Sequence, residues 1–240
     1  MDDTHRRITD DLVDELKRLS FGPPVSHVYN PLVYARSAYD TYLERFGAPP
    51  RQVVLVGMNP GPWGMAQTGI PFGEVTAVRE FLGIQSTVEK PRPMHPKRPV
   101  DGFECPRSEV SGRRVWGWVQ KTFETPERFF SRFFIANYCP LLFIEAGGRN
   151  RTPNNLPAAE RNPLEAACDR SLRRTVQYLA PRVVIGIGAF AAQRAAVALD
   201  GLDVRVGRIT HPSPANPRAN RDWEKRIAAE LKQAGVDTPS

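Results

Sequence analysis

The sequence has few side chains with which to build a metal centre or a disulfide framework. Only three of its 240 residues are cysteines, and none forms a CxxC pair: Cys105, Cys139 and Cys168. Three is an odd count that argues against a disulfide framework, and too few for a four-thiolate zinc or iron–sulfur site. The histidines form no HxxH or HxxxH pair: His5, His27, His95 and His211. We therefore expect no metal, no cofactor, and a reducing cytoplasmic location such as a bacterial cytosol or nucleoid.

Long apolar runs and signatures of covalent catalysis are also lacking. No stretch reaches the ~18 apolar residues of a membrane-spanning helix, and the charged N-terminus MDDTHRRITDDLVDEL lacks the apolar centre of a signal peptide. Neither a GxSxG motif nor a Cys/His signature is present. We expect a protein without a membrane partner, and a monomer.

Positive charge is what the chain has in excess. Its 33 Lys and Arg residues outnumber 26 Asp and Glu residues, which gives a net charge of +7. This balance suits a polyanionic partner, although many basic proteins bind none. The segment 86–114 concentrates this character: it holds five prolines and, from Lys90 to Arg114, seven basic residues against three acidic ones. We expect it to be a surface excursion, ordered or mobile, and not a domain boundary.

Hydrophobic patterns predict an α/β fold. Short β-branched apolar runs indicate buried strands at 52–59, 133–138, 182–188 and 204–210. Helical spacing is found at 7–20, 31–46, 163–179, 189–199 and 219–234. Strands that alternate with helices favour a mainly parallel sheet. We predict a single domain over residues 1–240, with 1–24 as an N-terminal helical extension.

The first motif that carries chemistry is GMNPGPWGMAQTGIPFGEV, residues 57–75, after the first predicted strand. Its five glycines and three prolines disfavour regular structure and predict a tight, shaped loop. Ligands of open parallel sheets bind beyond the carboxyl ends of the strands, where this loop would hold Asn59. A Gly/Pro connection with Trp63 and Phe72 as core plugs explains the same pattern. A P-loop does not, because no Gly-Lys-Ser/Thr follows.

The second motif is HPSPANPRANRDW, residues 211–223, after the last predicted strand. Pro212 disfavours α geometry at His211, so its imidazole should lie on an extended loop at the same sheet edge as Asn59. Basic residues follow at the predicted start of a helix, a natural phosphate site: Arg218, Arg221, Lys225 and Arg226. We expect these cations to keep His211 neutral. A proline-closed turn with a surface histidine is the alternative.

Two further signals are ambiguous. Asn137 ends the apolar run FFIAN, where it either needs partners in a buried site or caps the next turn. GIGAFA, residues 186–191, matches a dinucleotide-binding pattern, but Asp203 precedes the next strand instead of ending it. Only one predicted strand remains after it. Close strand–helix packing explains these glycines as well.

Together the two long motifs closely resemble those of the single-strand-selective monofunctional uracil-DNA glycosylases. GGRNRTPNNLP at 147–157 and the Cys-containing helix before RVVIGIG also resemble this family. The resemblance covers most of the chain. It implies a three-layer α/β/α sandwich around a four-stranded, mainly parallel sheet. It also implies an enzyme that flips uracil and oxidised 5-substituted uracils out of DNA and hydrolyses the N-glycosidic bond without metal, cofactor or strand cleavage.

Matched residue by residue, the resemblance implies that Asn59 positions the attacking water and His211 donates to the uracil oxygen that gains charge. The implied base-binding residues are Met58, Gly61, Phe72 and Asn137, where Phe72 stacks on the base and Asn137 recognises its Watson–Crick edge. The implied DNA contacts are Ser213, Pro214, Ala215, Asn216, Arg218 and Arg221. Ala215 departs from the family, which carries Arg in this DNA-filling wedge, and Trp63 stands where Phe is usual.

Two other functions fit parts of the pattern. A catalytically weak reader of damaged bases would keep the pocket and lack turnover. A nucleotide-cofactor enzyme would use GIGAFA instead. Excision of uracil from an oligonucleotide, detected by alkali cleavage, distinguishes the glycosylase from the damaged-base reader. Absorbance of bound nicotinamide or flavin would identify the nucleotide-cofactor enzyme.

Overall fold

Four parallel strands form the central sheet of the computed structural model, which describes residues 3–239. Their order is β3-β2-β6-β7. Their bounds are β2 (Val53–Gly57), β3 (Phe133–Asn137), β6 (Val183–Ile187) and β7 (Arg205–Ile209). The register pairs Gly57 with Asn137 and Ile187 with Ile209, so neighbouring strands end level at one edge. The predicted strands are confirmed, each slightly shorter than its apolar run.

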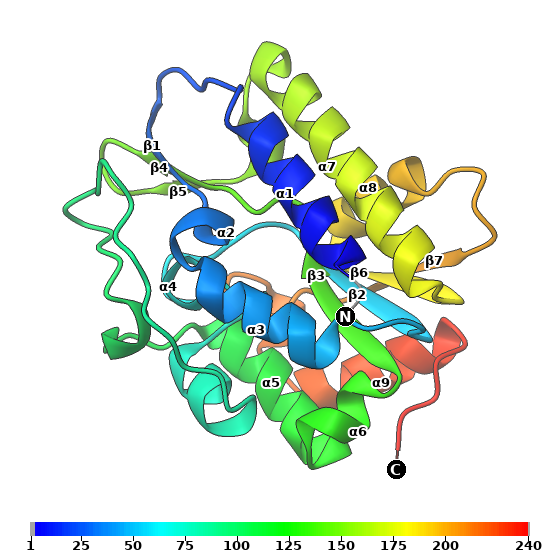
Figure 1. Ribbon diagram of the computed structural model, residues 1–240. Coiled ribbons are helices and arrows are strands. Elements are labelled where there is room, and N and C mark those ends of the chain that lie inside the picture. Colours follow the sequence, from blue (N-terminus) through cyan, green and yellow to red (C-terminus); the bar gives the residue numbers. More distant parts are fainter. Residues whose placement is uncertain (1–2, 240) are drawn as a thin grey trace.

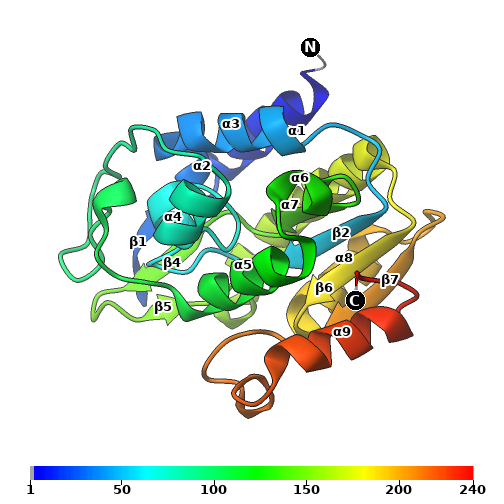
Figure 2. The same cartoon turned by 90° about the horizontal axis from the view of Figure 1, so that it is seen from below.

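Helices cover both faces of this sheet, which confirms the three-layer arrangement (Figures 1 and 2). One face carries α7 (Ala158–Leu179) and α8 (Ala189–Ala198), with α1 (Thr4–Leu16) packed against α7. The other carries α5 (Val110–Phe123), α6 (Pro126–Phe130) and α9 (Trp223–Gln233). The remaining long helix, α3 (Arg36–Phe46), follows the short α2 (Pro31–Tyr34). No helix within residues 3–239 is long and apolar enough to cross a membrane.

The β3 edge of the sheet is closed by α3 instead of another strand. Tyr42 on α3 is fully buried, and its hydroxyl donates to the Ile135 carbonyl of β3 at 2.8 Å. Its ring also packs against Phe130 and Phe134. An uncovered edge strand presents backbone groups that can pair with another chain, so α3 protects this edge.

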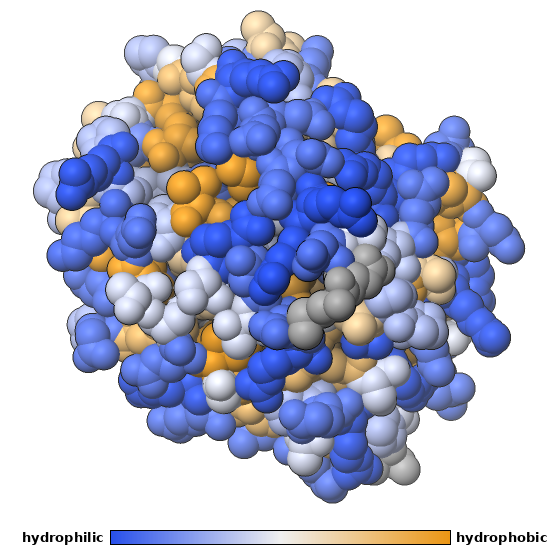
Figure 3. Space-filling view, in the orientation of Figure 1, coloured by the Kyte–Doolittle hydropathy of each residue, from blue (hydrophilic) through white to orange (hydrophobic). Residues whose placement is uncertain are grey.

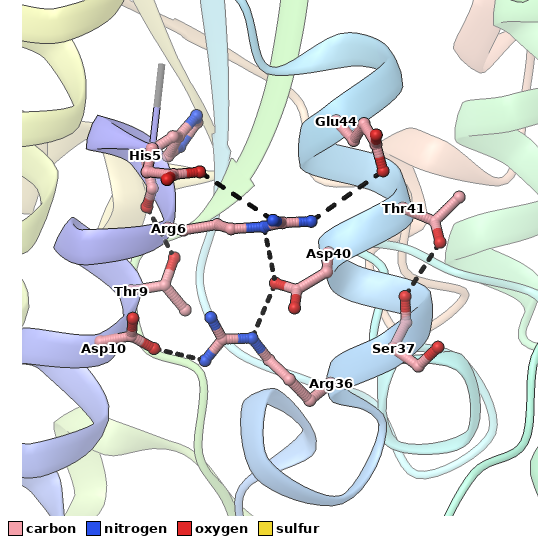
Figure 4. A network of polar contacts seen from close by, with 10 residues as sticks. His5, Arg6, Thr9, Asp10, Arg36, Ser37, Asp40, Thr41 and Glu44 are labelled. Atoms are coloured by element: carbon pink, nitrogen blue, oxygen red, sulfur yellow. Dashed lines mark hydrogen bonds and ion pairs between the residues drawn. The ribbon is translucent and has the colours of Figure 1, made fainter. Parts of the chain in front are cut away.

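The N-terminal helix α1 lies within the predicted helical extension at 1–24 and packs against α7. The apolar side of α1 is buried, and ion pairs join its exposed side to α3 (Figure 4). Arg36 contacts Asp10 at 2.6 Å and Asp40 at 2.7 Å, and Arg6 lies 3.7 Å from Asp40. Exposed ion pairs contribute about 0–1 kcal/mol each. Burial of the apolar side therefore dominates the docking of α1.

The patterns above do not predict a second, antiparallel sheet of order β1-β4-β5. Its strands are β1 (Val25–Tyr29), β4 (Leu142–Glu145) and β5 (Asn150–Arg151). A two-residue strand such as β5 is too short to show an alternating pattern. This sheet matters for function because β5 supplies a residue to the cavity described below.

Several predicted helix boundaries are wrong. The helix expected at 31–46 is interrupted between α2 and α3. The first turn of α7 precedes Pro163 and begins at Ala158, where exposed side chains give no apolar period. The last helix, α9, begins at Trp223, because Asp222 before it has a left-handed backbone with φ of 47°.

The basic segment 86–114 is tied down along its length. The Tyr29 hydroxyl accepts from the His95 N–H at 2.6 Å and donates to the Arg98 carbonyl at 2.9 Å. The last five residues of the segment are the first residues of α5. The short elements of the chain are α4 (Met65–Thr68), η1 (Ala77–Phe81), η2 (Gly102–Glu104), η3 (Pro153–Asn155) and η4 (Pro217–Ala219).

Replacing Tyr42 with Phe should lower the free energy of unfolding by about 1–3 kcal/mol, because the Ile135 carbonyl loses its buried donor. Urea denaturation measures this change. The control is Thr41→Ala on the same helix, whose hydroxyl bond to Ser37 is exposed; it should change stability by about 0.5 kcal/mol at most. Equal stability of Tyr42→Phe and the wild type would show that this bond does not hold α3 on the sheet.

Candidate active site

A cavity of about 270 Å³ lies beyond the carboxyl ends of β2, β3 and β7. Its lining residues are Met58, Asn59, Pro60, Gly61, Pro62, Met65, Phe72, Glu109, Ser111, Asn137, Asn150, Thr152, His211 and Ser213. Seven of these were singled out from the sequence: Met58, Asn59, Gly61, Phe72, Asn137, His211 and Ser213. The cavity is slightly smaller than a drug-sized ligand pocket, so it suits one flat heterocycle.

Asn137 reaches the cavity from the last position of β3. Its Nδ2 donates to the sulfur of Met65 at 3.0 Å, whereas its Oδ1 is buried and has no partner among residues 3–239. A Cβ on Gly57 would overlap this Oδ1 and would lie 2.7 Å from Cε2 of Phe72. An unpaired buried acceptor costs about 1–3 kcal/mol, so the site favours a ligand that donates a hydrogen bond here.

Phe72 presents its ring from a strained backbone. Its φ of 54° lies in the left-handed region, which is uncommon for a residue with a side chain. The Phe72 carbonyl accepts hydrogen bonds from Trp116 Nε1 at 3.1 Å and from the Glu74 N–H at 2.7 Å, and these hold the turn. The ring centroid lies 6.3 Å from that of His211. Phe72 therefore supplies an apolar surface on which a flat ligand can stack.

His211 presents a defined donor to the cavity. The backbone N–H of Ser213 donates to His211 Nδ1 at 3.1 Å, so Nδ1 is an acceptor and the ring proton lies on Nε2. Burial lowers the pKa of His211 to about 4, so the imidazole is neutral at pH 7. Neutrality agrees with the expectation from sequence, but its cause is desolvation and not the neighbouring cations.

Asn59 lies two residues after the end of β2, and a hydrogen bond to the backbone orients its amide. Nδ2 of Asn59 donates to the Leu141 carbonyl at 3.2 Å. This bond uses the donor side of the amide and leaves Oδ1 as an acceptor at the cavity. Such an acceptor can hold a water molecule by one of its protons.

Glu109 is a cavity residue that the sequence patterns did not reveal. Its carboxylate lies across the backbone of Gly61 and Gly64, where a Cβ on either glycine would overlap it. Among residues 3–239 this carboxylate has no hydrogen-bond or ion-pair partner. Burial, and to a lesser extent the charge of Glu74, raises the pKa of Glu109 to about 7. The cavity thus holds a carboxyl group that titrates near neutral pH.

The loop after β7 carries the residues predicted to contact DNA. Ser213 lines the cavity, whereas Pro214 and Ala215 are exposed. The Asn216 side chain donates to the His211 carbonyl at 3.1 Å, which anchors the loop. Arg218 and Arg221 are exposed and precede α9: Arg218 lies on the short turn η4, whereas Arg221 lies outside any helix.

A buried glutamine joins the loop after β2 to the basic segment. Gln67 is fully buried; its Nε2 donates to the carbonyls of Pro62 and Pro99, both at 2.9 Å. Its Oε1 accepts from the N–H groups of residues 101 and 102. Beside this junction the guanidinium groups of Arg98 and Arg107 lie 5.4 and 4.4 Å from the Trp63 ring centroid. These contacts hold two cations near the cavity.

The basic side chains near the cavity lack the carboxylate partners that others have. Within residues 3–239, no basic residue of 86–114 and none of Arg218, Arg221, Lys225 and Arg226 forms an ion pair. On α1, α3 and α7, by contrast, ion pairs are formed by Arg6, Arg36, Arg170 and Arg174. That face is largely hydrophilic (Figure 3). Uncompensated positive charge therefore gathers in the segments that flank the cavity.

Comparison with known proteins identifies the family. The model of the Uracil DNA glycosylase superfamily matches residues 44–232. The chain is 49% identical over 224 residues to a single-strand selective monofunctional uracil-DNA glycosylase of Rattus norvegicus, across 92% of this chain and 81% of that protein. The chain belongs to this glycosylase family. A Bos taurus protein of the same name is 48% identical over 227 residues, across 94% of this chain and 84% of that protein.

A solved structure supports the glycosylase fold independently. The crystal structure of WT Pedobacter heparinus SMUG2 matches with a TM-score of 0.67, over 95% of this chain and 98% of that one. Its sequence identity is 17%, so this likeness concerns the fold alone.

Other residues complete the glycosylase cavity without having been predicted. Asn150 and Thr152 come from the GGRNRTPNNLP stretch, which carried part of the resemblance but no assigned role. The Oδ1 of Asn150 is buried and unpaired among residues 3–239. Ser111 comes from the first turn of α5, where no sequence signal marks it.

The GIGAFA stretch has a packing role in this glycosylase. A Cβ on Gly186 would overlap the backbone of Ala192 in α8, and one on Gly188 would lie 3.2 Å from Cβ of His211. Asp203 is exposed and precedes β7. Close packing explains Gly186, and the φ of 95° at Gly188 lies in the region that favours glycine. Among residues 3–239, no three His, Cys, Asp or Glu side chains gather as a metal site.

The raised pKa of Glu109 predicts a pH-dependent gain in stability for Glu109→Gln. Folding raises this pKa from 4.5 to about 7, so ionisation of Glu109 destabilises the folded protein progressively between these pH values. The glutamine avoids this cost. We expect its gain in unfolding free energy to be about 2 kcal/mol larger at pH 8 than at pH 5. Urea titrations at the two pH values measure it, and an equal effect at both would contradict the raised pKa.

Proposed function

We propose that this chain flips uracil out of DNA and hydrolyses its N-glycosidic bond, leaving an abasic site. One observation carries the proposal: Asn137 Oδ1, the Nε2–H of His211 and the Phe72 ring meet in one cavity. A flat base with one N–H donor and adjacent carbonyl acceptors matches this set. The named function of relatives that are 48–49% identical supports the same reaction.

Asn137 recognises uracil by its N3–H and O4. The unpaired Oδ1 accepts from N3–H, and the second proton of Nδ2 donates to O4. Cytosine would present an amine to the amide donor and leave buried groups unpaired. Sites built in this way can reject the wrong partner by about 10⁴-fold.

His211 stabilises the leaving group. As the glycosidic bond breaks, the base takes the electron pair and gains negative charge at O2, while the sugar becomes cation-like. The Nε2–H of His211 donates to O2, and its position is fixed before the reaction by Ser213. Donors that are already in place where charge develops commonly make the greatest single contribution to catalysis.

Asn59 positions the nucleophile. Its free Oδ1 accepts a hydrogen bond from one water molecule, whose oxygen adds to C1′ of the cation-like sugar. The water then loses a proton to solvent, which yields the abasic sugar, and the uracil anion takes up a proton from solvent. An oxocarbenium ion needs little activation of its nucleophile, so an amide is sufficient. Among residues 3–239 no lysine lines the cavity, which supports hydrolysis without an amine nucleophile and hence without strand cleavage.

The protein binds DNA through the phosphate backbone, and the target base is extruded from the strand into the cavity. Extrusion costs roughly a few kcal/mol and is least costly for an unpaired base. The cations of 86–114 and 218–226 bind phosphates meanwhile, and Pro214 and Ala215 lie at the exposed tip of the 211–222 loop. The small Ala215 side chain fills less of a duplex gap than a longer one, which favours single strands here. The monomeric state, the cytosolic location and action on oxidised 5-substituted uracils stay predictions.

A uracil-containing oligonucleotide tests the proposal. Incubation followed by hot alkali should give strand breaks at uracil, whereas incubation without alkali should leave the strand intact. We expect activity to persist in excess EDTA, since none of the proposed roles uses a metal. Tight binding without any abasic product would instead identify a damaged-base reader.

Asn59→Ala and His211→Ala should reduce the single-turnover rate by about 10²–10³ each, because one loses the positioned water and the other the leaving-group donor. The dissociation constant for the oligonucleotide should change little, since backbone contacts dominate binding. Wild-type activity should fall as the pH drops toward 4, where His211 becomes protonated. This acid limb should be absent in His211→Ala, and a wild-type rate in that variant would refute its role.

Removing Arg98 and Arg107 together should weaken binding and flatten its salt dependence. Each phosphate contact contributes about 0.7 to the log–log salt slope on single strands, so the double alanine variant should lower the slope by about 1.4. Arg182→Ala is the matched control, because Arg182 is exposed and precedes β6 at the opposite end of the sheet. Equal salt slopes for the wild type, the double alanine variant and Arg182→Ala would show that the DNA phosphates contact other residues.

A further inference from the structure

We propose that Glu109 selects the 5-substituent of the excised base: its ionised carboxylate accepts a hydrogen bond from a 5-hydroxymethyl group, and its protonated form donates one to a 5-formyl group. This inference rests on the proposed function and adds a specificity-determining residue to it.

The position of Glu109 carries the argument. The residue precedes α5 and lines the same cavity as Asn59 and His211. Its two carboxyl oxygens lie over Gly61 and Gly64, so a Cβ at either position would displace them from this place. No donor among residues 3–239 satisfies these oxygens. A polar group that is desolvated at a cavity wall without a partner is completed by a donor on the ligand.

The residues already assigned to uracil leave one edge of its ring for the cavity wall that carries Glu109. His211 takes O2, Asn137 takes N3–H and O4, and Asn59 holds water at the carbon bonded to N1. The remaining edge carries C6 and C5. Gly61 lines the cavity two residues after Asn59, and the carboxyl of Glu109 lies against it. A substituent on C5 therefore meets the wall on which the carboxyl of Glu109 lies.

The charges around Glu109 allow it to change state at neutral pH. Burial and the nearby Glu74 raise the pKa of Glu109 to about 7. On the loop after β7, His211 has a pKa of about 4 and is neutral across this range. The loop of residues 58–64 brings no ionisable side chain. Arg107 and Arg113 are the nearest cations along the chain, and neither forms an ion pair with it.

The two states of the carboxyl favour different substituents. A carboxylate offers only acceptors, so it binds the hydroxyl proton of a hydroxymethyl group and repels a formyl oxygen. A protonated carboxyl offers a donor, which a formyl oxygen accepts. Raising the pH through 7 should therefore increase the preference for hydroxymethyluracil over formyluracil by about tenfold, the effect of one hydrogen bond.

Single-turnover rates on three single-stranded oligonucleotides test this inference. They carry 5-hydroxymethyluracil, 5-formyluracil or uracil at the same position, and rates are measured from pH 5.5 to 8.5. Uracil serves as the reference within each protein. We expect the hydroxymethyl-to-formyl ratio of the wild type to rise about tenfold with a midpoint near pH 7. Ionisation of the bases themselves is common to all proteins, so it cancels when variants are compared.

Glu109→Gln keeps the side-chain shape but cannot titrate, so the rise should disappear. Glu109→Asp keeps the acid but withdraws it from the wall by one methylene, so the rise should shrink, and this variant serves if the glutamine protein does not fold. A ratio with the same pH dependence in the wild type and Glu109→Gln would overturn the inference, as would a wild type that excises uracil but neither substituted base. A wild type that excises no uracil would instead overturn the proposed function.

Discussion

The missing side chain at Gly57 is the constraint on which the cavity depends. Parallel pairing places Gly57 beside Asn137, and the Phe72 ring comes back over the same point. A methyl group at Gly57 would displace the amide, the ring or both. Asn137, which we propose recognises the base, and Phe72, which we propose stacks on it, thus share one gap in the sheet edge. Phe72 holds its ring at this point from a left-handed backbone with φ of 54°.

Desolvation then gives the cavity its chemistry. The same burial that keeps His211 neutral keeps Glu109 close to its point of titration, although one is a base and the other an acid. A neutral donor can stabilise a base that becomes an anion. A fixed positive charge would do the same but would also hold the product in the cavity. Both groups depend on the backbone around them, which is Ser213 for His211 and the glycine pair for Glu109.

Sequence reasoning predicted the parallel sheet and the two long motifs because both leave local signals. Apolar runs mark buried strands. Asn59 ends the run 52–59, and His211 follows the run 204–210. Glu109 left no signal, since its place in the cavity comes from the path of 86–109 over the loop after β2, which Gln67 fixes through long-range hydrogen bonds. The strand β5 and the exposed first turn of α7 were missed because neither has an apolar period.

The division of charge over the surface affects how the protein meets DNA. Cations without carboxylate partners flank the cavity, whereas cations on α1, α3 and α7 are paired with carboxylates. A polyanion attracts the unpaired side first and turns the protein before contact, which raises the rate of productive encounter at low salt. Phosphate contacts are independent of sequence, so after landing the protein can slide along the strand with its cavity facing the bases.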